Sequence, residues 1–193
     1  MATTIEDGTG SGFSAKVSTS NRLFTDSVTE EKAVLASTNG NAFNFTTDFI
    51  TIGTGATNTE CGIIYIKNND DRDLEIHHLK MWLGNSGTIA KVRLYKNPTT
   101  GTLISSAIDG NDEVLNFGSS NEFDGLLYQG DGTALTVTNG SILSNIYLGV
   151  GMQQMLHEMY MGQVILPKGT SMAVTVESSI SINVSVEING FYT

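Results

Sequence analysis

The side chains of this sequence with the clearest chemical potential are acidic residues gathered in three turn-like segments. These segments are residues 68–73, residues 109–113, and Asp131 with its neighbours. Carboxylate and amide oxygens bind calcium, but no segment has the twelve-residue spacing, with a central glycine and a terminal glutamate, that builds an EF-hand. Solvated turns explain the same composition, so we predict no metal site.

Histidine and cysteine offer equally little for a reactive centre. His77 and His78 are neighbours in a predicted strand, so their side chains point to opposite faces unless a bulge intervenes, and they cannot chelate zinc as an i, i+4 helical pair would. His157 is too far away in sequence for any spacing argument. The single Cys61 cannot form an internal disulfide, and the apolar residues after it favour a buried, reduced thiol.

Motifs for known enzyme classes are also missing from the sequence. It contains no Gly-x-Ser-x-Gly elbow, Walker loop, dinucleotide fingerprint or zinc-protease motif. Asp112 and Glu113 are acids of the kind that glycoside hydrolases use, but neighbouring residues on a strand diverge. We therefore predict no enzyme activity, no catalytic residues and no cofactor.

Charge and hydropathy exclude two classes of partner. A net charge of −10 argues against general nucleic-acid binding, which needs a basic surface. Residues 106–193 carry nine acidic residues and only Lys168 as a base, so the C-terminal half presents an acidic surface. We expect no signal peptide and no membrane contact, because the first residues lack a basic and apolar leader and no apolar run reaches the roughly 20 residues that span a bilayer.

The elements that would position these groups are strands. Residues 61–83 contain two apolar runs joined by Asn- and Asp-rich turn residues, which predicts either a hairpin or a crossover between sheets of a sandwich. Leu74 and Ile76 alternate, but the apolar set then shifts by one residue to Leu79, so we predict a β-bulge at His77 or His78.

Further strands follow the same period of two. Phe43 and Phe45 with Ile50 and Ile52 predict a short strand pair, and residues 89–96 predict a half-buried strand with a basic outer face. The clearest strand is residues 180–188, whose alternate residues are all Ile or Val. We expect a strand from about Glu158 as well, with a helical turn before it as the alternative.

The sequence therefore predicts an all-β fold: an antiparallel, jelly-roll-like β-sandwich over residues 43–193, preceded by an extended N-terminal arm over residues 1–42. Residues 1–42 bury too little apolar surface to fold alone, and a disordered tail is the alternative for residues 1–20. Residues 109–133 predict a long, partly packed loop, and loops of this length are usually functional.

The aromatic residues leave one choice open. Trp82 with Tyr65, Tyr95 or Tyr128 could form a flat platform for a sugar, or Trp82 could be a core residue on a central strand.

Five segments resemble structural proteins from the virions of tailed bacteriophages. They cover much of the chain and are SNRLFTDSV (20–28), YIKNNDDRDLEI (65–76), LYKNPTTGTLIS (94–105), NFGSSNEF (116–123) and LPKGTSMAVTVE (166–177). The resemblance implies a β-sandwich or jelly-roll subunit of the virion, assembled in the host cytoplasm, that decorates or cements the capsid. A tail or fibre component, or a glycan- or receptor-binding module, is the alternative.

This resemblance implies a homo-oligomer, such as a trimer or ring, that contacts the major capsid protein or other virion proteins. It transfers no residue roles, so the interface is predicted from the chain itself. Apolar residues of the arm and of the long loop, together with basic residues that could meet the acidic half of another copy, give the predicted interface: Leu23, Phe24, Val28, Lys91, Arg93, Phe117 and Phe123.

Overall fold

The protein is described by a computed structural model covering residues 5–6, 14–15, 31–52, 59–84, 89–99, 106–107, 112–133, 137–149 and 154–193. The chain forms two units, residues 1–31 and residues 32–193. In the first unit, β1 (Ile5–Glu6) and β2 (Ser14–Ala15) pair antiparallel. The extended arm itself stays a prediction, because most of residues 1–30 lie outside the described residues.

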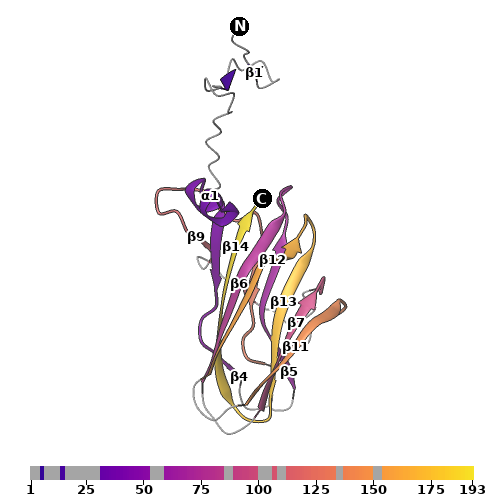
Figure 1. Ribbon diagram of the computed structural model, residues 1–193. Coiled ribbons are helices and arrows are strands. Elements are labelled where there is room, and N and C mark those ends of the chain that lie inside the picture. Colours follow the sequence, from indigo (N-terminus) through magenta and orange to yellow (C-terminus); the bar gives the residue numbers. More distant parts are fainter. Residues whose placement is uncertain are drawn as a thin grey trace, which may run out of the picture. The chain divides into compact units, whose positions relative to one another are not determined.

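The second unit is a sandwich of two antiparallel sheets (Figure 1), which confirms the predicted all-β sandwich. We call them the β13 sheet and the β14 sheet after their central strands. In order across the β13 sheet, the strands are β11 (Ser141–Gly149), β7 (Ile89–Lys96), β13 (Ser171–Ser178), β5 (Glu60–Asn68), β10 (Gly125–Gln129) and β8 (Ser106–Ala107). Across the β14 sheet they are β12 (Gln154–Leu166), β6 (Leu74–Gly84), β14 (Ile182–Tyr192), β3 (Ala42–Thr46) and β9 (Asp112–Val114).

Strand β14 carries the alternation that the sequence predicted. Ile182, Val184, Val186 and Ile188 are each at most 2% exposed, and they pack into the core between the sheets. β14 lies between β6 on one side and β3 on the other, so both of its edges are hydrogen-bonded. Its aliphatic side chains therefore lie at the centre of the core.

The segment over residues 61–83 is a crossover, because β5 lies in the β13 sheet and β6 in the β14 sheet. The predicted bulge in β6 is confirmed at His77. Asn189 of β14 pairs with His78 and the next residue, Gly190, pairs with Ile76, which leaves His77 as the extra residue. Ile76 and Leu79 are consequently both buried.

The predicted strand pair of residues 43–45 and 50–52 is wrong. β3 and β4 (Ile50–Ile52) do not pair with each other; both pair with β14, one after the other along its edge. Thr47 lies between them, where its N–H donates to Val186 O and its Oγ1 accepts from Val186 N, at 2.9 Å each. The polar residues between the two apolar runs are thus a break in one strand line, not the turn of a hairpin.

The connection from β7 to β11, residues 97–140, differs from the loop expected over residues 109–133. It contributes β9 to the β14 sheet and β10 to the β13 sheet. Long-range pairing with β3 and β5 creates these strands, although their Gly-, Asn- and Asp-rich surroundings favour loops. β12 likewise begins at Gln154, earlier than expected, and the alternative helical turn is not present there.

A short helix, α1 (Lys32–Thr38), precedes β3. Its sequence, KAVLAST, contains two alanines and one leucine, which favour a helix, and Gly40 follows its end with a φ of 70°, the left-handed conformation that terminates helices. Ala36 is buried against Ala42 and Phe191 at the end of the β14 sheet. The sandwich unit therefore includes α1, which lies ahead of the boundary that the sequence suggested after residue 42.

No helix among the described residues is both long and apolar enough to cross a bilayer.

Candidate assembly surfaces

The predicted interface residues that the structure describes differ in exposure. Phe117 is fully exposed, with a relative exposure of 105%, and Lys91 is half-buried. Phe123 and Arg93 are each 8% exposed, Phe123 in the core and Arg93 on the outer face of the β13 sheet. Leu23, Phe24 and Val28 lie outside the described residues.

Phe117 projects from a turn that is held by polar contacts of its neighbours. Ser119 N donates to Asn116 O at 2.9 Å, and Asn116 Oδ1 accepts from Gly118 N at 3.0 Å. The Nδ2 of Asn116 donates to Thr38 O at 2.9 Å, which ties the turn to the last residue of α1. The ring of Phe117 is therefore displayed on a backbone that is already fixed.

A second tie anchors the far end of this loop. Asn121 Nδ2 donates to Gly40 O at 3.0 Å, and the loop approaches Gly40 so closely that a Cβ there would lie 2.1 Å from Ser119 Oγ. Glycine at position 40 thus both ends α1 and admits the loop. We call residues 115–121 the Phe117 loop.

Other apolar side chains are exposed beside Phe117. Val34 and Leu35 on α1 and Leu115 at the start of the loop are 43–50% exposed. They border or adjoin an open groove of about 600 Å³, lined by Ala33, Val34, Ser37, Thr38 and residues 115–118. Contiguous apolar surface of this kind typically marks an interaction site. No hydrophobic period in the sequence locates this surface, because its residues come from a helix and a loop about 80 positions apart.

Phe123 was expected at an interface, whereas the structure places its side chain in the core between the sheets. Its ring packs edge-on against Phe43 and Phe45, with centroids 5.9 and 4.8 Å away, and stacks on Tyr192 at 6.1 Å. Aromatic contacts of these geometries stabilise a core. Phe123 therefore fixes the loop to the sandwich instead of meeting a partner.

Arg93 was expected to face another copy, whereas in the described structure it forms ion pairs within its own chain. Its Nη1 lies 2.8 Å from Glu60 Oε2, and its Nη2 pairs with Glu177 at 2.5 Å. Burial lowers the pKa of Arg93, but the hydrogen bond with Glu177 and the charge of Glu60 outweigh it, so the net shift is upward. The guanidinium is neutralised within its own chain and is not available for an intersubunit ion pair.

Glu60 is the hub of this cluster on the outer face of the β13 sheet. Thr175, which is fully buried, donates its hydroxyl to Glu60. Burial, together with a hydrogen bond to Glu60, raises the pKa of Tyr95 to about 12. Lys91, two residues from Arg93, places its Nζ 5.6 Å from the ring centre of Tyr147. Only Lys91 of the two predicted basic residues thus remains partly open to a partner.

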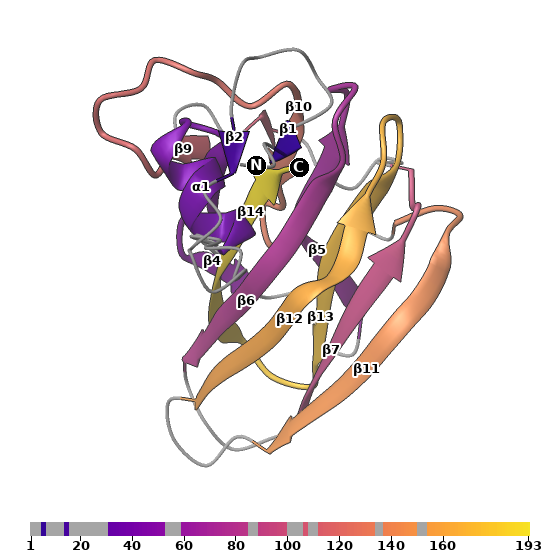
Figure 2. The same cartoon turned by 45° about the horizontal axis from the view of Figure 1, so that its top comes forward.

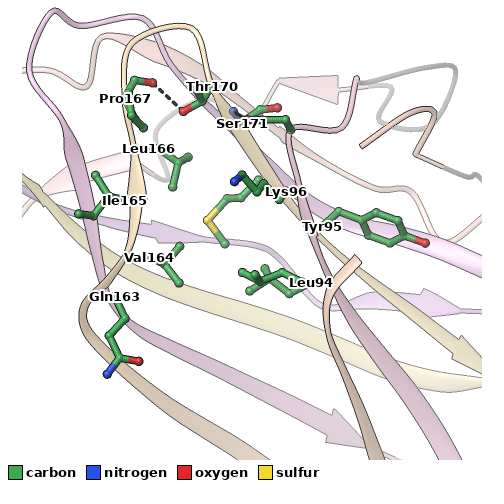
Figure 3. A pocket seen from close by; sticks show the side chains of 13 residues that line it. Leu94, Tyr95, Lys96, Gln163, Val164, Ile165, Leu166, Pro167, Thr170 and Ser171 are labelled. Atoms are coloured by element: carbon green, nitrogen blue, oxygen red, sulfur yellow. Dashed lines mark hydrogen bonds between the residues drawn. The ribbon is translucent and has the colours of Figure 1, made fainter. Parts of the chain in front are cut away.

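A pocket of about 390 Å³ opens between the edges of the two sheets (Figure 3). Val164 and Leu166 of β12 face Leu94 of β7 across it, while the side chain of Tyr95 points away. Leu94, Leu166 and Met172 are 3–4% exposed and make an apolar floor. Its volume lies in the range of binding pockets, and its lining is mostly aliphatic.

The lip of this pocket is exposed and apolar. Leu143 is 53% exposed and Ile165 47% exposed. Leu143 is the extra residue of a bulge in β11, because Ile142 pairs with Tyr95 and Ser144 with Leu94. Bulges redirect side chains, and this one turns Leu143 to the pocket mouth.

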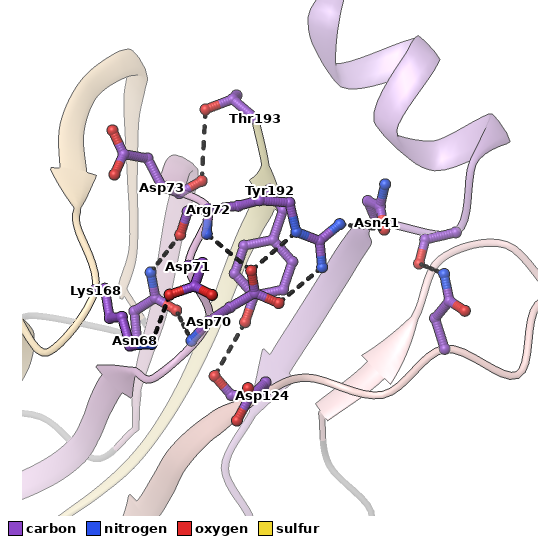
Figure 4. A network of polar contacts seen from close by, with 12 residues as sticks. Asn41, Asn68, Asp70, Asp71, Arg72, Asp73, Asp124, Lys168, Tyr192 and Thr193 are labelled. Atoms are coloured by element: carbon purple, nitrogen blue, oxygen red, sulfur yellow. Dashed lines mark hydrogen bonds and ion pairs between the residues drawn. The ribbon is translucent and has the colours of Figure 1, made fainter.

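The acid-rich turn at residues 68–73 is a structural network (Figure 4). Arg72 donates its Nε and Nη2 to the two oxygens of Asp70, at 2.9 and 2.8 Å, and its guanidinium lies 4.5 Å from the ring centre of Tyr192. The hydrogen bond from Arg72 lowers the pKa of Asp70 to about 2. Lys168 pairs with Asp71 at 2.5 Å. The turn's Asp70 and Asp71 thus already have cationic partners.

Asn68 joins this turn to the connection between β12 and β13. It is fully buried, and its Nδ2 donates to Arg72 O and Leu166 O, at 2.8 Å each, while its Oδ1 accepts from Asp70 N at 2.9 Å. All three of these hydrogen bonds join the side chain to backbone groups. Asn68 therefore holds one wall of the pocket in place.

The other candidate metal groups do not converge in the part of the chain that the structure describes. No cluster of three His, Cys, Asp or Glu side chains occurs among those residues. The bulge brings the rings of His77 and His78 to 4.3 Å, edge to face. Asp131 accepts from Thr133 N at 2.9 Å in a local turn, and residues 109–111 are outside the described segments.

The predicted aromatic platform is not formed as a unit. Tyr65, Tyr95 and Tyr128 lie in one cross-strand row on the β13 sheet with Ala173 between them, where Val137 packs against them and Tyr65 is 4% exposed. Trp82 lies on the other sheet, so it joins none of these three tyrosines, and its burial is only intermediate, so it is not a core residue either. Its ring contacts the exposed Phe49, with centroids 5.1 Å apart.

Comparison of the chain with protein-family models gave no match, and comparison with curated protein sequences gave none.

Proposed function

We propose that this chain is a non-enzymatic structural protein of a tailed-bacteriophage virion, a decoration or cement protein that binds the capsid shell and other copies of itself. The observation that carries the proposal is the strand order. The series β3-β14-β6-β12 lies in one sheet and the series β5-β13-β7-β11 in the other. Along the chain, these eight strands alternate between the two sheets except at the step from β7 to β11. Two interlocked Greek keys with this order form a jelly roll, an architecture of viral capsid and lectin domains.

Because a fold hosts many functions, the surface must supply the rest of the argument. Phe117 exposes its whole ring on a fixed turn, and Val34, Leu35 and Leu115 extend the apolar surface around it. A soluble monomer gains nothing from this arrangement, whereas a subunit that docks on its neighbours buries it. Asp70 and Arg93, by contrast, already have oppositely charged partners within their own chain.

The direct test is addition of the purified chain to undecorated shells. Co-sedimentation with shells at a saturating, stoichiometric ratio is the expected result. Binding to tails or fibres but not to shells would move the protein to the tail, and no binding to any virion part would refute the proposal. Val34 belongs to the exposed apolar surface around Phe117, so Val34→Asp should weaken shell binding or self-association. Lys80→Met, on an outer sheet face, should weaken neither.

Glycan binding is a second candidate because of one feature of the β14 sheet. The ring of Trp82 lies over Gly84, where a Cβ would be 2.1 Å from Trp82 Cη2, and Phe49, 69% exposed, adjoins it. Ser185 pairs with Trp82 in the next strand and offers a hydroxyl beside the rings. Retention on host-cell glycans that is lost in Trp82→Ala would favour this candidate, and absence of retention by the wild type would remove it.

A further inference from the structure

The Phe117 loop and the pocket between the sheets lie on opposite edges of the sandwich. In the β14 sheet, β9 is at one end of the strand order and β12 at the other. β9 ends three residues before Phe117, whereas residues 163–166 of β12 line the pocket. Figure 2 shows β9 on one side of the sandwich, and β12, β7 and β11 on the other.

We infer that Phe117 of one copy inserts into the pocket between β12 and β7 of a second copy. This inference deepens the assembling role proposed above and rests on it. The occupant is thus a side chain of the same protein, and the site is complete only when two copies meet.

The shapes and polarities of the two parts agree. A cavity of 150 Å³ is large enough for a benzene ring, so the pocket of about 390 Å³ admits a phenylalanine side chain with the backbone that carries it. The ring would meet the aliphatic floor of Leu94, Leu166 and Met172 and would cover the exposed Leu143 at the lip. The turn at residues 116–119 is already fixed by Asn116, so little ordering entropy opposes docking.

Charges near the two parts are complementary. Glu122 and Asp124 are exposed just after the Phe117 loop. Lys96, also exposed, lines the pocket. In a chain of net charge −10, this pairing places a cation where an acidic neighbour approaches.

The opposite placement decides the type of assembly. A two-fold dimer would need each rigid copy to present both edges to the same partner, and edges on opposite sides of a sandwich cannot do so. The contact is therefore heterologous, head to tail, and such contacts generate rings when the rotation closes. We expect a closed ring of three or more copies.

Two pairs of variants of the full chain test the contact, with subunit number measured by light scattering and dissociation by dilution. Phe117→Ala should weaken association by about 30-fold or more, the loss at an interface hot spot. Phe49→Ala, which also removes an exposed ring, is its control. Leu143→Glu places a carboxylate at the pocket mouth and should weaken association similarly, whereas Ile142→Glu, on the same strand and 47% exposed but outside the pocket lining, should not.

Photo-crosslinking locates the contact directly. With 4-benzoylphenylalanine at position 117, peptide mapping should place the crosslink on residues 163–172 or 94–97 of another copy. Crosslinks elsewhere, equal association of Phe117→Ala and Phe49→Ala, or a wild type that stays monomeric at its highest soluble concentration would each overturn the inference. Shell binding is measured separately. A wild-type monomer that still binds shells would overturn this inference but leave the shell-binding role standing, whereas a wild type that neither self-associates nor binds shells would refute both proposals.

Discussion

Replacing Arg93 by methionine separates an internal role from an interface role for this residue. Arg93 is 8% exposed, and its guanidinium lies between two carboxylates, those of Glu60 and Glu177. Methionine fills much of the same space with apolar atoms but supplies no charge. Glu60, whose side chain is 18% exposed, would then keep its negative charge without the cation that balances it.

The size of the effect follows from burial. Breaking a buried ion pair from one side costs about 3–5 kcal/mol because the remaining charge stays desolvated, whereas an exposed pair contributes about 0–1 kcal/mol. Glu60 keeps its hydrogen bonds from Thr175 and Tyr95, and Glu177 is 34% exposed and can be hydrated. These partners place the expected loss at the lower end, about 3 kcal/mol.

Urea unfolding of Arg93→Met at neutral pH measures this loss directly. The matched control is Lys80→Met, which breaks the Lys80–Glu187 pair, where both side chains are more than a third exposed. Its expected cost is below about 1 kcal/mol. If Arg93→Met lost less than that and instead abolished self-association, Arg93 would be an interface residue and the internal assignment would be refuted.

Three further predictions follow from buried groups. Asn68→Ala should cost about 2–4 kcal/mol in urea unfolding, since three backbone partners lose one bond each, and a loss below 1 kcal/mol would contradict the network. The pKa of Tyr95 is raised to about 12, whereas an unfolded tyrosine titrates near pH 10, so the unfolded state loses its proton first. The free energy of unfolding should therefore fall between about pH 10 and 12, and Tyr95→Phe should make that fall smaller. Val184→Asp, at a fully buried position of β14, should prevent folding, as judged by loss of cooperative unfolding and by aggregation; a soluble, cooperatively folding variant would contradict the register.

The sequence predicted those parts of the fold that depend on local period. Alternation of apolar residues gave the burial of Val184 and its neighbours, and the one-residue shift after Ile76 gave the bulge at His77. Both follow from geometry within a single strand, where successive side chains alternate between faces. Such features require no knowledge of the partner strand.

Features that depend on partners were not predictable in the same way. By pattern alone, residues 43–45 and 50–52 could pair with each other or with a third strand. Only the fold shows that both pair with β14. Arg93 occupies a polar-face position of its strand like Lys91, yet Glu60 and Glu177 from β5 and β13 enclose it. Exposure of Phe117 and burial of Phe123 differ for the same reason: both are phenylalanines in a Gly- and Asn-rich loop, and tertiary contacts alone distinguish them.

The connection from β7 to β11 gives the molecule two unlike edges. By adding β9 beside β3 and β10 beside β5, it extends both sheets on one side, and it carries Phe117 there. On the other side β11 and β12 have a ladder partner on only one flank among the described strands, and β11 contains no charged residue to discourage contact. A head-to-tail subunit requires such a difference, because identical edges would pair about a two-fold axis and end the assembly at a dimer. The insertion therefore does more than lengthen the sheets: it makes the two edges of the subunit different, which is the property that the proposed ring needs.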